Sequence, residues 1–104
     1  MKIDLDHMQT AADTACDLLK SLANRHRLLI LCRLVEGEHS VGQLAEFLGI
    51  RDSTVSQHLA LLRRDRIIAA RREGQTVWYH IESEPARDLV STLYRCFCVT
   101  PEAA

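Results

Sequence analysis

Two helical patterns, separated by a glycine, occupy residues 39–65, HSVGQLAEFLGIRDSTVSQHLALLRRD. In the first pattern, apolar residues recur three and four positions apart until Gly49, a residue suited to ending a helix. In the second, three apolar residues share one narrow face, and we expect Asp52 to cap its start. The inward-facing residues of this second helix are Val55, Leu59 and Leu62. Two short helices joined in this way predict a helix-turn-helix.

The pattern changes in residues 67–81, IIAARREGQTVWYHI, where β-branched and aromatic residues flank a short polar stretch. Such residues favour strands, and the turn at residues 73–75 predicts a β-hairpin. A hairpin directly after a helix-turn-helix is typical of a winged helix-turn-helix.

The segments on either side complete the predicted fold. Apolar residues at helical spacing predict a helix over residues 8–22, and Asn24 is expected to cap a second, largely buried helix. After the hairpin, Ser83 is expected to cap a last helix with Pro85 in its first turn. The sequence therefore predicts a mainly α fold with a small β-hairpin, in a single domain spanning residues 1–104.

The outward side of the second helix of the pair is suited to the major groove of DNA. It carries short hydrogen-bonding groups, one amide and one cation, without a bulky side chain to prevent entry. The expected DNA contacts on this helix are Ser53, Thr54, Ser56, Gln57, His58 and Arg64. For His58, packing beneath the helix is an alternative to touching DNA. On the wing, the expected contacts are Arg71, Arg72, Gln75 and Thr76.

The charge distribution is consistent with a DNA-binding face on an otherwise acidic body. Residues 51–80 hold six basic and three acidic side chains, a balance of +3, whereas the whole chain has a formal net charge of −1. A local basic patch steers a protein toward phosphates.

Chain length and cysteine content suggest a small cytoplasmic protein. At 104 residues the core is modest, so we expect burial against a partner copy to add stability. No stretch approaches the roughly 20 apolar residues that a membrane helix needs, and the first 20 residues are amphipathic and acidic, unlike a signal peptide. We therefore expect a cytoplasmic location, no membrane partner and no disulfide framework among the four cysteines.

Three segments together resemble the ArsR/SmtB family of bacterial repressors: residues 22–34, residues 39–65 and residues 71–81. The resemblance implies a homodimer joined through its first and last helices, which binds double-stranded operator DNA and releases it on a chemical stimulus. Two positions depart from the family pattern. Arg51 replaces the usual small cap residue, and Arg66 replaces a common glycine, so that Arg66 or a neighbour has to accept a strained helix exit.

The stimulus is inferred from the thiols. The segment EHSVGQL lacks the cysteine pair of many metal-sensing members, so we expect no metal site of the common kinds and no cofactor. Cys32 and Cys98 match the two reactive cysteines of the persulfide-sensing branch, and this resemblance implies that persulfides or polysulfides crosslink them. The alternatives are core packing for Cys32 and Cys96, a core or interface role for Cys16, and binding of arsenite or another soft metal at Cys96 and Cys98.

A third class, a thiol oxidoreductase built on Cys96 and Cys98, is disfavoured. The sequence has no thioredoxin-like βαβ pattern and no nucleophile with a positioned base. We therefore expect a regulator and not an enzyme.

Overall fold

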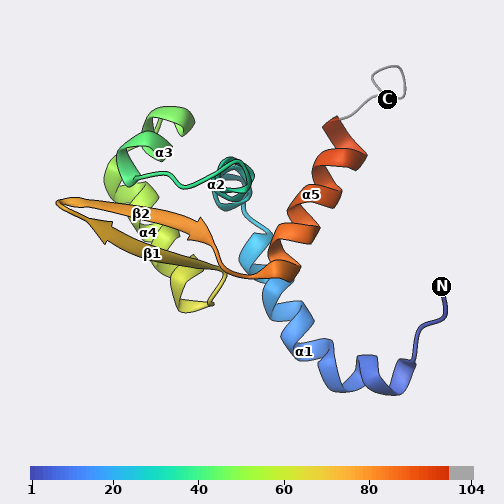
Figure 1. Ribbon diagram of the computed structural model, residues 1–104. Helices are drawn as coiled ribbons and strands as arrows, with labels where there is room; N and C mark the ends of the chain where they lie inside the picture. Colours follow the sequence, from blue (N-terminus) through green and yellow to red (C-terminus); the bar gives the residue numbers. More distant parts are fainter. Residues whose placement is uncertain (99–104) are drawn as a thin grey trace.

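The computed structural model describes residues 1–98 and confirms the predicted order of elements. Five helices and one antiparallel hairpin form a winged helix-turn-helix (Figure 1). The elements are α1 (Leu5–Leu22), α2 (Arg25–Val35), α3 (Val41–Leu48), α4 (Asp52–Arg64), β1 (Ile68–Glu73), β2 (Thr76–Ile81) and α5 (Glu84–Cys98). Within the described residues, no helix is both long and apolar enough to span a bilayer.

Side-chain caps define where most of the helices begin. Asn24 caps α2 by accepting a 3.1 Å hydrogen bond from the Arg27 amide, and Ser83 caps α5 through the amide of Ala86 at 3.2 Å, both as predicted. The start of α1 differs from the prediction, because the Asp4 carboxylate accepts from two amides of the first turn. That cap starts the helix at Leu5, ahead of its first strongly apolar turn.

The helix-turn-helix begins with a capping box. Ser40 accepts from the Gln43 amide at 3.3 Å, and the Gln43 side chain accepts from the Ser40 amide at 3.1 Å. Gly49 ends α3 in the left-handed conformation, with φ 70°. The predicted cap of α4 is wrong: Arg51 occupies the N-cap position without a side-chain bond, and Asp52 is the first helical residue. There its charge still complements the positive end of the helix.

The end of α4 confirms the strained exit at Arg66, which has φ 60°. The Ile67 amide bonds to the Leu62 carbonyl at 2.9 Å, and the Arg66 amide bonds to the Arg63 carbonyl at 3.0 Å. These two bonds form a Schellman motif, which favours glycine at the position that Arg66 occupies. Burial of both Leu62 and Ile67 supplies the apolar contact that accompanies the motif.

Helix α2 lies at the centre of the molecule and supplies much of the core. Its neighbours α3, α4 and α5 each bury an apolar stripe against it or against one another. The largest fully buried side chains are Ile30, Leu31, Leu34, Leu44, Val55, Leu59, Leu62, Ile67, Ile68 and Val90. This core holds α4 with its other side facing solvent.

The hairpin and the helices α1 and α5 extend to opposite sides of the core (Figure 1). The hairpin closes at Glu73 and Thr76. Strand β2 is attached to the segment before α3, where His39 and Tyr79 exchange backbone hydrogen bonds of 3.2 and 2.9 Å. In α1, only Ser21 and Leu22 are buried. The molecule therefore presents the wing and α4 on one side and long, exposed stretches of helix on the other.

Candidate nucleic-acid interface and thiol pair

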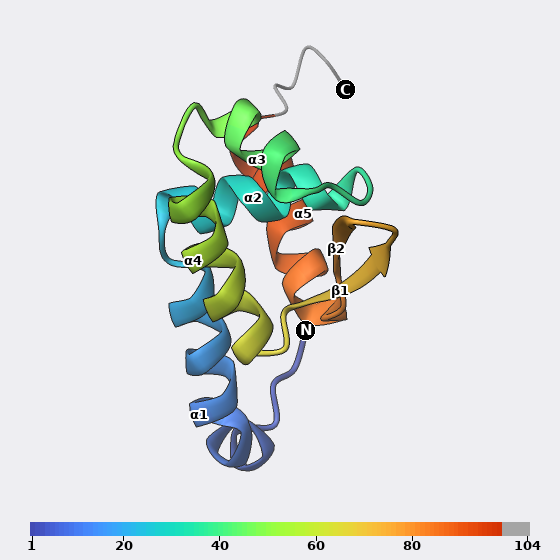
Figure 2. The ribbon, with the colours of Figure 1, turned by 90° about the vertical axis from the view of Figure 1, so that its left-hand side faces the viewer.

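The solvent side of α4 carries the predicted small polar side chains. Ser53, Ser56 and Gln57 are exposed and Thr54 is half-buried, whereas the opposite stripe is fully buried. Figure 2 shows α3 and α4 on the face turned toward the viewer. The structure therefore leaves the predicted recognition face open.

His58 lies on a different side of α4 from these residues. Its ring centroid is 5.6 Å from that of His26 on α2, and within the described chain the buried Nδ1 atoms of both rings have no hydrogen-bond partner. Burial, followed by the positive charges of Arg27 and His26, lowers the pKa of His58. The position of His58 is consistent with packing beneath α4, and its contact with DNA stays a prediction.

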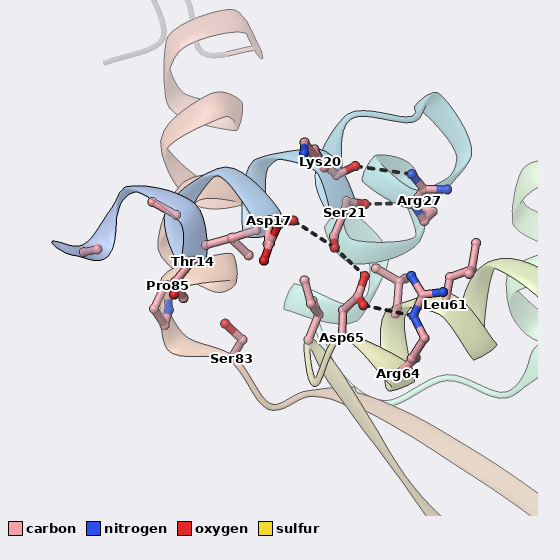
Figure 3. Close-up of a pocket in the computed structure, with 15 residues that line it drawn as sticks. Thr14, Asp17, Lys20, Ser21, Arg27, Leu61, Arg64, Asp65, Ser83 and Pro85 are labelled. Carbon is pink, nitrogen blue, oxygen red and sulfur yellow. Dashed lines mark hydrogen bonds and ion pairs between the residues drawn. The ribbon is translucent and has the colours of Figure 1, made fainter. Parts of the chain in front are cut away.

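Arg64 stands at the end of α4 with 69% of its side chain exposed. Its Nε donates a 3.1 Å hydrogen bond to Asp65, whose other carboxylate oxygen accepts from Ser21. These residues line a pocket of about 860 Å³ between α1, α4 and the start of α5 (Figure 3). The hydrogen bond from Ser21, and then that from Arg64, lowers the pKa of Asp65.

The two arginines of the wing are in different surroundings. Arg72, Gln75 and Thr76 are exposed near the hairpin tip. The Arg71 guanidinium is held by two carboxylates, those of Glu38 and Glu73. Glu38 was not predicted to matter, because it precedes Arg71 by 33 residues and no local pattern relates the two.

Cys32 lies in the C-terminal half of α2, and Cys98, at the tip of α5, is near enough for the charge of its thiolate to act on Cys32. Cys32 is half-buried against the core, and Cys98 is the exposed last residue of α5. Burial raises the pKa of Cys32, and the negative charges of a Cys98 thiolate and of Glu36 raise it further. All four cysteines are free, and Cys16 and Cys96 are both exposed, so neither lies in the core of the chain.

A pocket of about 570 Å³ opens beside Cys32 between α2, α3 and α5. Its wall includes Phe47, Tyr94 and Arg95, and the guanidinium of Arg33 lies 5.4 Å from the centre of the Phe47 ring. A small molecule can therefore approach the half-buried thiol. Within residues 1–98, no three His, Cys, Asp or Glu side chains are grouped so that they could hold a metal ion.

The fold and the open face of α4 define a winged helix-turn-helix DNA-binding protein. The family model for bacterial regulatory proteins of the arsR family matches residues 24–70. The transcriptional activator HlyU of Vibrio cholerae is 42% identical over 96 residues, covering 92% of this chain and 89% of that protein. The biofilm growth-associated repressor of Xylella fastidiosa is 38% identical over 99 residues, covering 95% and 87%. The chain belongs to the ArsR family.

Solved structures agree with this assignment. Reduced HlyU from Vibrio cholerae superposes with a TM-score of 0.85 at 42% identity, over 89% of this chain and 98% of that one. The transcriptional repressor BigR from Xylella fastidiosa superposes with a TM-score of 0.87 at 38% identity, over 94% and 100%. The chain is therefore a transcriptional regulator with a winged helix-turn-helix fold, and not an enzyme.

Proposed function

We propose that this regulator binds operator DNA as a homodimer and releases it when sulfane sulfur from persulfides or polysulfides links Cys32 to Cys98. The observation that carries the proposal is the proximity of these two thiols, 66 positions apart in the chain: a thiolate at Cys98 is near enough for its charge to raise the pKa of Cys32. In the reduced state, repression follows from occupancy of the operator.

The dimer is proposed to form through α1 and α5. Exposed apolar side chains recur along α1 at Leu5, Met8 and Leu19, and α5 exposes Tyr94 and Phe97. Exposing such apolar surfaces to water is unfavourable for a monomer. Helices α1 and α5 both lie on the side away from the hairpin (Figure 1). Two copies joined there would present two α4 helices to successive major grooves, about 34 Å apart.

The proposed DNA contacts are polar groups of α4 and of the wing that are exposed or, for Thr54, half-buried. Gln57 is suited to pairing with a base edge, and the hydroxyl groups and Arg64 are suited to phosphates or bases. The proposed set is Ser53, Thr54, Ser56, Gln57, Arg64, Arg72, Gln75 and Thr76. His58 and Arg71 are left out of this set because their side chains face partners within the protein.

The sulfur chemistry assigns different roles to the two thiols. Cys98 is exposed and reacts first: its thiolate attacks the outer sulfur of a persulfide RSSH, the S–S bond of the donor breaks and RSH leaves. A second transfer through the pocket gives the persulfide of Cys32. The terminal sulfur of one protein persulfide then attacks the inner sulfur of the other, which expels H₂S and leaves a trisulfide bridge. No outside oxidant is needed.

The packed helices would transmit the effect of a bridge between α2 and α5 to the DNA-binding side. The bridge would tie α5, a proposed dimer helix, to α2, whose His26 packs against His58 of α4. A shift of α2 relative to α5 would change the spacing of the two α4 helices, and so their fit to the two half-sites of the operator.

The experiment that tests this function measures intact mass, mapped bridges and operator affinity on the same samples. The reduced protein is treated with glutathione persulfide or with hydrogen peroxide. We expect a Cys32–Cys98 bridge carrying extra sulfur and a loss of operator binding with persulfide only. C32S and C98S should bind operator normally and fail to release it, whereas C16S and C96S should behave like the parent.

Two outcomes would overturn the proposal. One is release of DNA by persulfide in the C32S and C98S variants. The other is release by arsenite together with no response to persulfide, which would indicate a soft-metal sensor at Cys96 and Cys98. Analytical ultracentrifugation of L19E, which places a charge on the exposed face of α1, tests the dimer separately.

A further inference from the structure

The Arg71 side chain of the wing is paired with two carboxylates and remains 48% exposed. Its Nε lies 3.0 and 2.8 Å from the two carboxylate oxygens of Glu38, and its Nη2 lies 2.8 Å from Glu38 Oε1. Its Nη1 donates at 2.8 Å to Glu73. The fork-like pairing with Glu38 is the stronger kind of charge-assisted hydrogen bond. With two carboxylates around one guanidinium, this cluster carries a net negative charge.

The chain holds Glu38 in place through the backbone on its C-terminal side. The neighbouring residue His39 exchanges two backbone hydrogen bonds with Tyr79 of β2, and Ser40 forms the capping box that starts α3. The carboxylate therefore belongs to a fixed segment and not to a loose loop. The pairing also lowers the pKa of Glu38 and raises that of Arg71, which keeps both groups charged near neutral pH.

Arg72 lies on the opposite side of β1, because successive strand residues alternate between the two faces. It is exposed, and within residues 1–98 it forms no ion pair shorter than 4.0 Å. A phosphate near Arg72 would meet an unopposed cation. A phosphate near Arg71 would meet one cation and two anions.

We propose that Glu38 withholds Arg71 from the DNA backbone, so that the wing contacts phosphate through Arg72 alone and Glu38 limits the affinity of the regulator for DNA. Phosphate contacts supply the part of the affinity that does not depend on sequence. By lowering this part, Glu38 reduces binding to unrelated DNA and leaves discrimination to the side chains of α4.

The test compares the reduced E38Q variant with the parent on operator DNA and on an unrelated duplex, across a series of salt concentrations. E38Q leaves Arg71 paired with Glu73 alone, and the loss of the Glu38 charge should raise affinity for both duplexes about two- to fivefold, the range of an exposed ion pair. The slope of log K against log salt should steepen by about 0.9 per protomer, the value for one added phosphate contact. In the parent background, R72Q should flatten the slope and R71Q should leave it unchanged.

Two controls isolate the cause. The E38Q/R71Q double variant should lose the gain, because the gain requires the Arg71 cation. E82Q removes the same charge from an exposed residue just after β2 and should leave affinity and slope at the parent values. In the parent, the NMR resonance of the Arg71 Nε–H group should remain unchanged on addition of operator.

Three results would overturn the proposal. They are an E38Q affinity equal to or below that of the parent, a gain that persists in E38Q/R71Q, and a slope that R71Q flattens as much as R72Q does. None of these measurements involves the thiols, so the outcome is independent of the proposed sulfur response.

Discussion

Ser21 donates a 2.6 Å hydrogen bond to Asp65, which joins the last turn of α1 to the residue that ends α4. The same hydroxyl lies 3.2 Å from the Asp17 carbonyl, and Arg27 Nε donates to the Ser21 carbonyl at 2.7 Å (Figure 3). These bonds cross the wall of the larger pocket. They connect α1, which buries little apolar surface in the single chain, to the DNA-binding side.

Replacement of Ser21 by alanine should destabilise the chain. Ser21 is buried, and its loss leaves one oxygen of Asp65 without its protein donor, so we expect the free energy of unfolding to fall by about 1 kcal/mol. Urea denaturation measures the change. S56A removes a hydroxyl from an exposed position on α4 and should leave stability unchanged; an equal loss in both variants would refute the role of the Ser21–Asp65 bond.

The same variant should alter the stability of the protein in acid. The pKa of Asp65 lies below its ordinary value of 3.8 in the folded chain, so its contribution is present above that value and is lost as the pH falls through the folded pKa. S21A removes the main cause of the shift. The difference in unfolding free energy between parent and S21A should therefore narrow below about pH 3.8, and a constant difference down to pH 2 would contradict this cause.

Replacement of Arg66 by glycine should stabilise the protein. Arg66 has φ 60° at the end of α4, where a side chain costs about 1 kcal/mol relative to glycine. We expect R66G to raise the unfolding free energy by up to about that amount. As a control, R63G places glycine inside the helix and should lower stability by about 1 kcal/mol. A loss of stability in R66G would show that its side chain makes a larger contribution than the strain costs.

The packing of His58 predicts a loss of stability in mildly acidic solution. Because the folded chain lowers the pKa of His58 below its ordinary 6.5, the unfolded chain binds a proton more readily. The free energy of unfolding should therefore decrease as the pH falls below about 6.5 toward the folded pKa. H58L should weaken this dependence and H7L, at an exposed histidine, should not; chemical denaturation between pH 5 and 8 decides between them.

Replacement of Gln57 or Arg64 by alanine should weaken operator binding without disturbing the fold. An amide or guanidinium that pairs with a base contributes about 1–3 kcal/mol, so a loss of about tenfold is expected for Gln57. Fluorescence anisotropy with operator and with a mutated site measures both affinity and discrimination. Q9A, on exposed α1, is the matched control. If both Q57A and R64A bind operator with the affinity of the parent, α4 is not the helix that recognises the operator sequence.

Local signals in the sequence predicted most of the fold. The caps at Asn24 and Ser83, the stop at Gly49 and the strained exit at Arg66 all depend on residues within a few positions of one another. The capping box at Ser40 was not predicted, although the spacing of Ser40 and Gln43 is its ordinary signature. The wrong cap at Asp52 has a clear cause, since an acidic residue is favourable both at the cap and in the first turn.

The long-range relationships were less accessible to prediction. The pairing of Glu38 with Arg71 and that of Ser21 with Asp65 join residues far apart in the chain, and no periodicity relates them. The pairing of Cys32 with Cys98 stays a prediction, and it was drawn from family resemblance and not from spacing. Likewise, no local pattern predicted that the ring of His58 would lie beside that of His26.

The proposed DNA contacts on α4 and the two thiols lie on different helices. The thiols belong to α2 and α5, and neither is a residue of α4. Because the inward stripe of α4 carries the packing, Ser53 and Gln57 can vary without changing the surroundings of Cys32. Under the proposed function, a duplicated gene can thus drift toward a new set of target promoters and keep its response to sulfane sulfur. By the same argument, replacements at the two thiols would change the proposed response and leave the DNA-binding side chains of α4 as they are.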